Sequence, residues 1–216
     1  MISQLHYITQ STPSYRHLDT VKDVCEAGCK WIQLRMKHES PEERMDIATT
    51  AKGICTKHQA KLIINDHVDL TKAVKADGVH LGKTDMSPEE ARKVLGDKFI
   101  IGGTANTLDD ILHLYHTHAV DYIGLGPFRY TKTKENLSPI LASEGYAKIL
   151  EQLRKQHVKL PIVAIGGIRL NDIQSIMRLG LDGIAVSSLI TFSDDKKRLI
   201  ENIEEEINHG TATYRG

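Results

Sequence analysis

Short apolar runs alternate with longer amphipathic stretches along most of this chain. Eight of the runs are rich in Ile, Val or Leu and are bounded by Gly, Asp or Pro, which is the pattern of short strands. They cover Leu5–Thr9, Trp31–Arg35, Leu62–Asn65, Gly78–Leu81, Phe99–Gly102, Tyr122–Leu125, Ile162–Ile165 and Gly183–Ser187. The runs are nearly continuous and do not alternate in polarity, which favours strands that are covered on both faces, as in a parallel sheet.

The stretches between the runs predict helices. Two of them follow a Ser-Pro-Glu-Glu sequence, at Ser40 and Ser87. That sequence supplies a capping serine, a proline in the first turn and a glutamate three residues after the cap. Apolar or small residues then recur close to helical spacing. The predicted helices cover residues 42–58, 68–75, 91–95, 107–118, 143–156, 170–180 and 196–208.

The strand–helix alternation predicts the fold. Eight alternations within 216 residues indicate an α/β protein, a single (β/α)8 TIM barrel that takes residues 1–216 as one domain. Two doubly wound domains with open sheets are the alternative. We find no linker, low-complexity tract or break in composition that would support a division into two domains.

Composition and charge exclude several classes of protein. Lys and Arg number 28, as do Asp and Glu, and a net charge of zero argues against a dedicated nucleic-acid binder. No apolar run is long enough for a transmembrane helix, and the N-terminal residues lack a signal-peptide pattern. Cys25, Cys29 and Cys55 are an odd, sparse set typical of a reducing compartment, so we expect a cytoplasmic protein without membrane partners. Homo-oligomerisation stays open.

Active sites of such barrels lie at the carboxyl ends of the strands, so the polar residues that follow each run are the candidates. Gln33, Arg35 and Lys37 alternate with apolar residues after the second run and share one side of the strand. Arginine binds phosphate with two parallel hydrogen bonds, and lysine acts as a point charge. Taken alone, these residues are better explained as a solvated loop with two basic side chains than as a phosphate site.

Two carboxylates follow the next two strands. Asp66 comes after the third run, beside Asn65, and Asp85 comes after the fourth. Because neighbouring strand ends meet at the same edge of a barrel, these carboxylates predict a Mg²⁺ site completed by substrate phosphate and water. The alternatives are a helix cap for Asp66 and a turn residue for Asp85.

The later strand ends suggest hydroxyl and backbone donors. Thr104 follows a pair of glycines, and the connection over residues 127–142, the longest in the chain, carries Thr131, Thr133 and Lys134. Such a long connection is a binding loop or a disordered surface loop. Gly167, Ser187 and Ser188 follow the last two strands, where barrels of this type often bind a phosphate through backbone N–H groups. We therefore expect two anion sites in one mouth.

Several segments together resemble the thiamine phosphate synthase family. They are QLRMK, INDHVDL, ADGVHLGKTDM, DYIGLGPFRYTKTK and VAIGGI, and the resemblance runs from about Leu5 to about Ile190. It implies an enzyme that joins 4-amino-5-hydroxymethyl-2-methylpyrimidine diphosphate to 4-methyl-5-(2-phosphooxyethyl)thiazole, with Mg²⁺ as cofactor. The products would be thiamine phosphate and pyrophosphate, and the expected mechanism is a dissociative substitution at the pyrimidine methylene carbon.

The same resemblance implies a role for each site residue. Arg35, Lys37 and Asn65 match residues that hold the diphosphate, and Asp66 and Asp85 match the metal ligands. Gln33 and Thr104 stand where the family has residues near the pyrimidine. Lys134 matches a lysine that reaches the pyrophosphate, so Lys134, Arg35 and Lys37 are the expected catalytic residues. The thiazole phosphate would be bound by Thr131, Thr133, Gly167, Ser187 and Ser188.

Three departures from the family pattern stand near these residues. They are Gly103-Thr104-Ala105-Asn106, Lys83, and Phe128-Arg129-Tyr130. Thiazole tautomerases share the fold but tend to lose the diphosphate and metal residues and to carry a histidine after the sixth strand. Here the diphosphate set is present and no histidine lies between Gly124 and Lys134, which favours the synthase.

Parts of the sequence are compatible with functions other than that of a synthase. A non-catalytic binder of a phosphorylated thiazole would not need two metal carboxylates. A sugar-phosphate isomerase would need a general base, and Asp66 could serve as one. The histidines at 113, 116 and 118 could suggest a metal site, but histidines near the end of a helix are ordinary.

Overall fold

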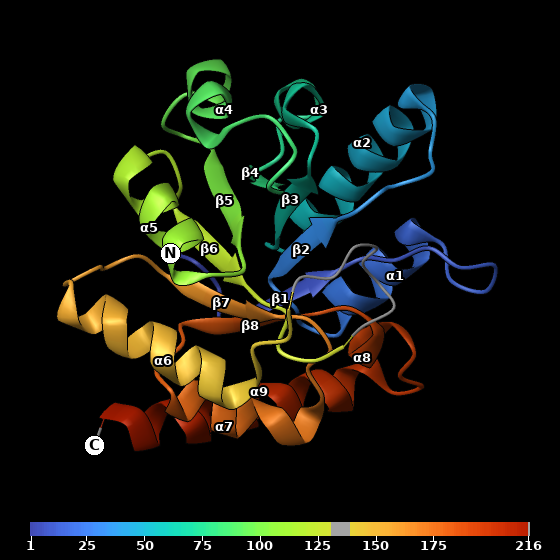
Figure 1. Cartoon of the computed structure of the whole chain (residues 1–216). Coiled ribbons are helices and arrows are strands. Elements are labelled where there is room, and N and C mark those ends of the chain that lie inside the picture. Colours follow the sequence, from blue (N-terminus) through green and yellow to red (C-terminus); the bar gives the residue numbers. More distant parts are fainter. Residues whose placement is uncertain (131–138, 216) are drawn as a thin grey trace.

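Eight parallel strands close into a barrel in chain order in the computed structural model, which describes residues 1–130 and 139–215 (Figure 1). Each strand pairs with the next along the chain, and β1 pairs with β8 to close the ring. The predicted TIM barrel is therefore confirmed. The strands are β1 (Leu5–Ile8), β2 (Trp31–Leu34), β3 (Lys61–Asn65), β4 (Gly78–Leu81), β5 (Ile100–Ala105), β6 (Tyr122–Leu125), β7 (Ile162–Ile165) and β8 (Gly183–Val186).

Helices surround the strands, as Figure 1 shows. The bounds are α1 (His17–Glu26), α2 (Pro41–Lys57), α3 (Val68–Ala73), α4 (Pro88–Leu95), α5 (Leu108–Thr117), α6 (Ala142–Lys155), the 3-10 turn η1 (Leu170–Asp172), α7 (Ile173–Arg178), α8 (Ser188–Thr191) and α9 (Lys196–Arg215). Ser40 and Ser87 cap α2 and α4 as predicted, and each accepts a hydrogen bond from the backbone N–H three residues later. No helix in the described part of the chain is long and apolar enough to cross a membrane.

The structure adds two helices to the predicted elements and extends two others, β5 and α9. Helices α1 and α8 were not predicted, because α1 lacks a side-chain cap and α8 is a single turn. Strand β5 continues to Ala105, since Gly103 and Thr104 pair with β6. Helix α9 runs well past the predicted end at residue 208. Its second half packs on α7, where Gly210 lies so close that a Cβ would stand 2.5 Å from the Cβ of Met177.

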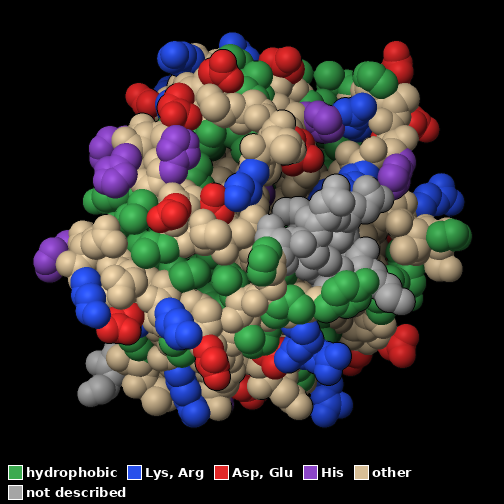
Figure 2. Space-filling view, in the orientation of Figure 1, with side chains coloured by type: hydrophobic (Ala, Val, Ile, Leu, Met, Phe, Trp, Pro, Cys, Tyr) green, Lys and Arg blue, Asp and Glu red, His purple; other side chains and the backbone are tan. Residues whose placement is uncertain are grey.

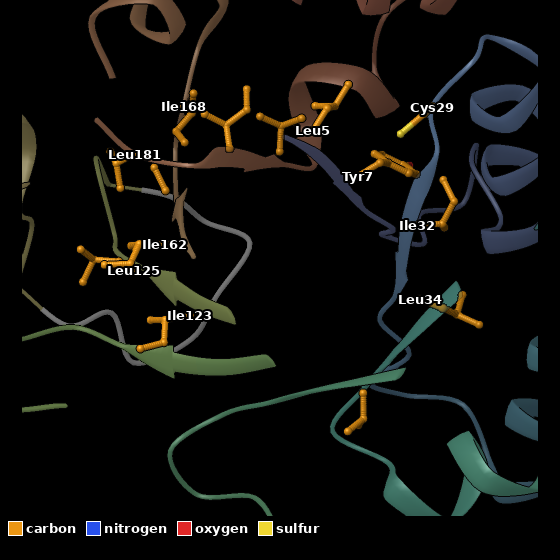
Figure 3. Close-up of a cluster of buried hydrophobic side chains, with 14 of the residues drawn as sticks. Leu5, Tyr7, Cys29, Ile32, Leu34, Ile123, Leu125, Ile162, Ile168 and Leu181 are labelled. Atoms are coloured by element: carbon orange, nitrogen blue, oxygen red, sulfur yellow. The ribbon is translucent and has the colours of Figure 1, made fainter. Parts of the chain in front are cut away.

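The apolar side chains form two separate cores. Outward-facing strand residues pack against the helices, and Figure 3 shows several of them, among them Leu5, Tyr7, Ile32 and Leu34. The inward-facing positions form a second cluster that includes Trp31 and Tyr122. Each strand is thus buried on both faces, as the continuous apolar runs indicated.

The inside of the barrel is aromatic at one end of its axis and polar at the other. His6 stacks on Trp31 with ring centroids 4.3 Å apart, and Tyr122 meets both rings edge-on. Gln33, His80 and Thr104 occupy inward positions nearer the carboxyl ends of their strands and line a cavity. His6, Trp31 and Tyr122 form an aromatic plug, and this plug is the floor of the polar cavity.

Candidate active site

A cavity of about 500 Å³ lies at the carboxyl ends of the strands. Figure 2 shows this face of the molecule, with side chains of both charges near a central hollow. Within the described residues, all of the predicted site residues line this cavity: Gln33, Arg35, Lys37, Asn65, Asp66, Asp85, Thr104, Gly167, Ser187 and Ser188. Thr131, Thr133 and Lys134, which were also predicted, lie outside the described residues.

A hydrogen-bonded row crosses the ends of β2 and β3. The amide of Gln33 donates to the Asn65 side-chain oxygen at 2.7 Å, and the Asn65 side chain in turn lowers the pKa of the neighbouring Asp66 carboxyl, against the larger effect of burial. Gln33 and Asn65 are both buried. The row fixes the orientation of two amides whose flips would otherwise cost little, so the cavity presents a defined pattern of donors and acceptors.

Asp66 and Asp85 face one another at the mouth. Burial and the neighbouring Asp85 carboxylate raise the pKa of Asp66 to about 7, while Arg35 opposes this rise. Two carboxylates this close repel when both are ionised, and a bound cation would relieve the repulsion. Oxygen donors of this kind suit a hard divalent ion such as Mg²⁺. No group of three or more His, Cys, Asp or Glu side chains occurs in residues 1–130 and 139–215, so an ion here would need further oxygens from substrate and water.

The structure also tests the alternative interpretations of these two residues. Asp66 is not a helix cap, because His67 occupies the cap position of α3 and makes no side-chain capping bond. Asp66 has a positive φ of 69°, an uncommon conformation for a residue other than glycine. Asp85 does act as a turn residue, since one of its carboxylate oxygens accepts the Gly82 N–H at 2.6 Å. That bond holds Asp85 in place, close enough to Asp66 to raise the pKa of the Asp66 carboxyl.

A second hydrogen-bonded row reaches Thr104, and the sequence analysis missed its other members. The Tyr122 hydroxyl lies 3.0 Å from His80 Nδ1, and His80 Nε2 lies 3.0 Å from Thr104 Oγ1. Gly102 makes room for this row, because a Cβ there would stand 2.3 Å from the Tyr122 ring. A histidine at the second inward position of a predicted strand was the signal that could have pointed to this row.

The hydrogen bonds from Tyr122 through His80 to Thr104 have a preferred donor-to-acceptor direction. Tyr122 is fully buried, and its hydroxyl has no second partner in the part of the chain that the structure describes. A neutral His80 therefore satisfies every group when Tyr122 donates to Nδ1 and Nε2–H donates to Thr104. In that arrangement the Thr104 hydroxyl keeps its own proton for an acceptor in the cavity.

Two cations at the mouth are already paired. The ammonium of Lys83 lies 2.7 Å from the carboxylate of Asp110, which also accepts the backbone N–H of Thr107, the cap residue of α5. Its charge is thus directed at Asp110, which lowers the pKa of that carboxyl although burial opposes the change. Arg129 makes two parallel hydrogen bonds to Asp172, at 2.6 and 2.9 Å, and a third to the Gly167 carbonyl at 2.9 Å.

The opposite side of the cavity offers backbone groups and hydroxyls. Gly167 has a φ of 67°, and a Cβ there would stand 2.8 Å from the Tyr130 carbonyl oxygen, so only glycine fits. The Ser187 hydroxyl is buried and has no partner among the described residues. A buried hydroxyl without a partner is costly unless a ligand satisfies it, so this side of the cavity is suited to an anion.

The histidine-rich end of α5 lies away from the cavity. His113, His116 and His118 are exposed, and Figure 2 shows histidines gathered on that flank. They do not form a group able to hold a metal within the described residues. The interpretation as ordinary histidines near the end of a helix is therefore the one that fits.

Comparison with known proteins gives consistent results. The family model described as thiamine monophosphate synthase matches residues 5–190. A thiamine-phosphate synthase of Bacteroides fragilis is 51% identical over 88% of this chain and 93% of its own length. One from Flavobacterium johnsoniae is 45% identical over 96% of this chain and 97% of its own. The solved thiamine phosphate pyrophosphorylase from Pyrococcus furiosus is 30% identical, with a TM-score of 0.83 over 96% of both chains.

Proposed function

This chain belongs to the thiamine monophosphate synthase family, and from that premise we propose how its cavity works. It is an enzyme, a transferase that forms thiamine phosphate from a pyrimidine diphosphate and a thiazole phosphate with release of pyrophosphate. In that reaction the bond between the pyrimidine methylene carbon and the diphosphate oxygen breaks. A new bond forms from the thiazole nitrogen to the same carbon. Different parts of the cavity would serve these two events.

The diphosphate binds at the ends of β2 to β4. Arg35 and Lys37 supply the positive charge, and Asn65 supplies an amide donor. Asp66 and Asp85 would hold Mg²⁺, which would neutralise charge on the departing pyrophosphate. The support is the pair of facing carboxylates, half-buried beside Arg35, in the same cavity as Lys37. These fixed charges are oriented before the reaction starts, so they stabilise the charge that develops on the leaving group.

The pyrimidine ring binds between Gln33 and Thr104. The amino group of the ring can donate electrons to the methylene carbon, so a cationic pyrimidine intermediate is reasonable and the substitution is dissociative. Thr104 would donate its hydroxyl proton to a ring nitrogen, as the direction of the Tyr122–His80–Thr104 row favours. Gln33 is oriented by its bond to Asn65 and would contact the same ring.

The thiazole phosphate binds on the opposite side of the cavity. Gly167, Ser187 and Ser188 would hold it through backbone N–H groups and the buried Ser187 hydroxyl. Anchoring this phosphate aims the thiazole nitrogen at the methylene carbon. Thr131 and Thr133 are proposed to assist at this phosphate and Lys134 at the pyrophosphate, by resemblance to the family alone.

One observation carries the proposal: a single cavity places Arg35, Lys37 and the Asp66–Asp85 pair at one side, and at the other a Ser187 hydroxyl that no described residue satisfies. The test is to incubate the purified protein with both substrates, with and without Mg²⁺, and to measure thiamine phosphate and pyrophosphate in equal amounts. We expect product only with Mg²⁺. Equal rates after complete chelation of divalent ions would refute the metal assignment and leave the cations alone to stabilise the leaving group.

A further inference from the structure

A carboxylate, an imidazole and a hydroxyl lie in a row beside the end of β2. Thr9 directly follows β1, His17 begins α1, and Glu39 lies just before α2. His17 Nδ1 is 3.0 Å from Thr9 Oγ1, and His17 Nε2 is 3.0 Å from Glu39 Oε1. Thr9 and His17 are buried, with 0% and 4% of their surface exposed. None of the three was singled out by the sequence, because they come from three different segments.

Only one arrangement of protons satisfies the row. Burial lowers the pKa of His17 despite the nearby Glu39, so the imidazole is neutral. Because a carboxylate only accepts, His17 Nε2 carries the proton and donates to Glu39. His17 Nδ1 then accepts the Thr9 hydroxyl proton. The Thr9 oxygen is left to accept one further hydrogen bond.

That further bond comes from Arg35. The Arg35 backbone N–H donates to Thr9 Oγ1 at 3.0 Å, and the Thr9 N–H donates to the Gln33 carbonyl at 2.9 Å. In a regular parallel ladder the Arg35 N–H would pair with the backbone carbonyl of Thr9. The Thr9 hydroxyl thus replaces the Thr9 backbone carbonyl as the acceptor for the Arg35 N–H. This replacement occurs at the end of β2, next to the cavity.

The row does not have the properties of a nucleophile with its base. In acyl-transfer enzymes a hydroxyl of this kind attacks the substrate, and for that it must be reachable. Thr9 is completely buried and is absent from the cavity lining, whereas Arg35 and Gln33 line the cavity. The consequence of the row is therefore mechanical: it fixes the backbone of the residue whose side chain faces the substrate.

We propose that Thr9, His17 and Glu39 are positioning residues that fix the end of β2 and so direct the Arg35 side chain toward the diphosphate. This inference rests on the proposed role of Arg35 at the diphosphate. A misplaced cation stabilises the leaving group less, and errors of about 1 Å in the position of such groups are costly to rate.

The first test compares isosteric changes at one buried atom. Thr9→Val removes the hydroxyl and keeps the shape, and Thr9→Ser keeps the hydroxyl. We expect Thr9→Val to lower kcat/KM for the pyrimidine diphosphate about tenfold while the KM for the thiazole phosphate stays within about twofold. Thr9→Ser should restore the rate.

A matched control is Thr20→Val. Thr20 is equally buried, and its hydroxyl donates to the Arg16 and His17 carbonyls within α1. This control should leave kcat/KM for the diphosphate close to wild type. An equal loss in Thr20→Val, or equal losses toward both substrates in Thr9→Val, would show that the effect is general destabilisation and would overturn the proposal.

A second pair of variants covers the case in which Thr9→Val does not fold. Glu39 is partly exposed, so Glu39→Ala should fold, and it removes the acceptor that fixes the His17 proton on Nε2. We expect a selective loss toward the diphosphate of about threefold, restored by Glu39→Gln, whose amide oxygen still accepts. Wild-type kinetics in Glu39→Ala would overturn the proposal.

Nitrogen-15 NMR of the imidazole gives a readout that is independent of activity. We expect His17 in the folded protein to carry its proton on Nε2 and none on Nδ1. A proton on Nδ1 would overturn the proposed direction of the row even in an inactive preparation. Conversely, if Arg35→Ala leaves kcat/KM for the diphosphate unchanged while the tautomer is as expected, the assignment of Arg35 fails and the geometry of the row stands.

Discussion

Charged side chains around the cavity differ in whether a protein group already neutralises them. Lys83 and Arg129 are paired with Asp110 and Asp172. Asp66 and Asp85 instead bring two like charges together, and burial with this neighbouring carboxylate raises the pKa of Asp66 to about 7, against the opposing effect of Arg35. A carboxyl whose pKa is raised in this way at the substrate side of a barrel is typical of a functional site.

Removing one carboxylate should weaken metal binding. We expect Asp85→Ala to lose most of its activity and to need a higher Mg²⁺ concentration for what remains, because one of two proposed ligands is gone. Thermal melts provide a second measurement. Mg²⁺ with pyrophosphate should raise the Tm of the wild type and change that of the variant little. Wild-type rate and wild-type Mg²⁺ dependence in Asp85→Ala would refute the metal site.

Lys83 departs from the family pattern close to the proposed metal site. Because its ammonium is 2.7 Å from Asp110, we expect Lys83→Gln to leave the Mg²⁺ dependence of the rate within about twofold of wild type. The variant and Asp110→Asn should behave alike in a Mg²⁺ titration of the initial rate. A large shift in the Mg²⁺ requirement of Lys83→Gln alone would show that its charge reaches the metal.

At the scale of elements, single side chains join loops that follow different strands. Arg129 lies in the connection after β6, and Asp172 ends η1 after β7. Besides its two bonds to Asp172, Arg129 binds the Gly167 carbonyl, and its N–H donates to the Gly166 carbonyl at 2.9 Å. Gly167, which would help to hold the thiazole phosphate, and the preceding Gly166 are thus held by the neighbouring loop.

Breaking this link should affect one substrate more than the other. We expect Arg129→Ala to raise the KM for the thiazole phosphate about tenfold and to leave the KM for the diphosphate nearly unchanged. The charge-reversed double variant Arg129→Asp with Asp172→Arg should recover part of the loss. Lys155→Ala, which breaks a surface pair with Glu151, is the control and should be silent. Equal KM changes for both substrates would argue against a local role.

At the scale of the whole molecule, the barrel is closed at one end by aromatic packing and open at the other. The plug of His6, Trp31 and Tyr122 contains a histidine that is 1% exposed and bonds to the Ser3 carbonyl at 2.9 Å. Burial lowers the pKa of His6 to about 3 from 6.5. The packing that supports the cavity floor therefore requires a neutral imidazole.

This requirement makes stability depend on acidity. Below pH about 6.5 the unfolded chain binds a proton at His6 that the folded chain does not. The stability contributed by the neutral His6 is thus fully present above that pH and is lost as the pH falls toward about 3. At about 1.4 kcal/mol per pH unit, the loss from this one group reaches at most about 5 kcal/mol.

Urea unfolding measured between pH 7 and pH 4 tests this expectation. His6→Phe keeps an aromatic ring on Trp31 and should flatten the fall in unfolding free energy over that range. The exposed His113 offers a control, and His113→Gln should leave the slope unchanged. An unchanged slope in His6→Phe would assign the acid sensitivity to other groups, such as His17, whose pKa burial also lowers.

The order of the strands could be predicted from the sequence, and so could the location of the site at the carboxyl ends of the strands. Nearly continuous apolar runs and the Ser40 and Ser87 caps are local signals, and closure of eight strand–helix units places every strand end at one mouth. For that reason Arg35, Lys37, Asp66 and Asp85 could be chosen before the structure was known. The same signals are weak in α1 and α8, and both helices were missed.

What the tertiary structure alone decided is which side chains meet. Thr9 with His17 and Glu39, Tyr122 with His80 and Thr104, and Arg129 with Asp172 join residues from different segments. Periodicity reports on the environment of a residue within its own element and carries no information on its partner across the barrel. Those partners follow from strand register and loop geometry, which are fixed only when the whole ring packs together. The sequence by itself thus determined the barrel and the end of it that carries the site residues. The tertiary structure decided which contacts hold those residues in position.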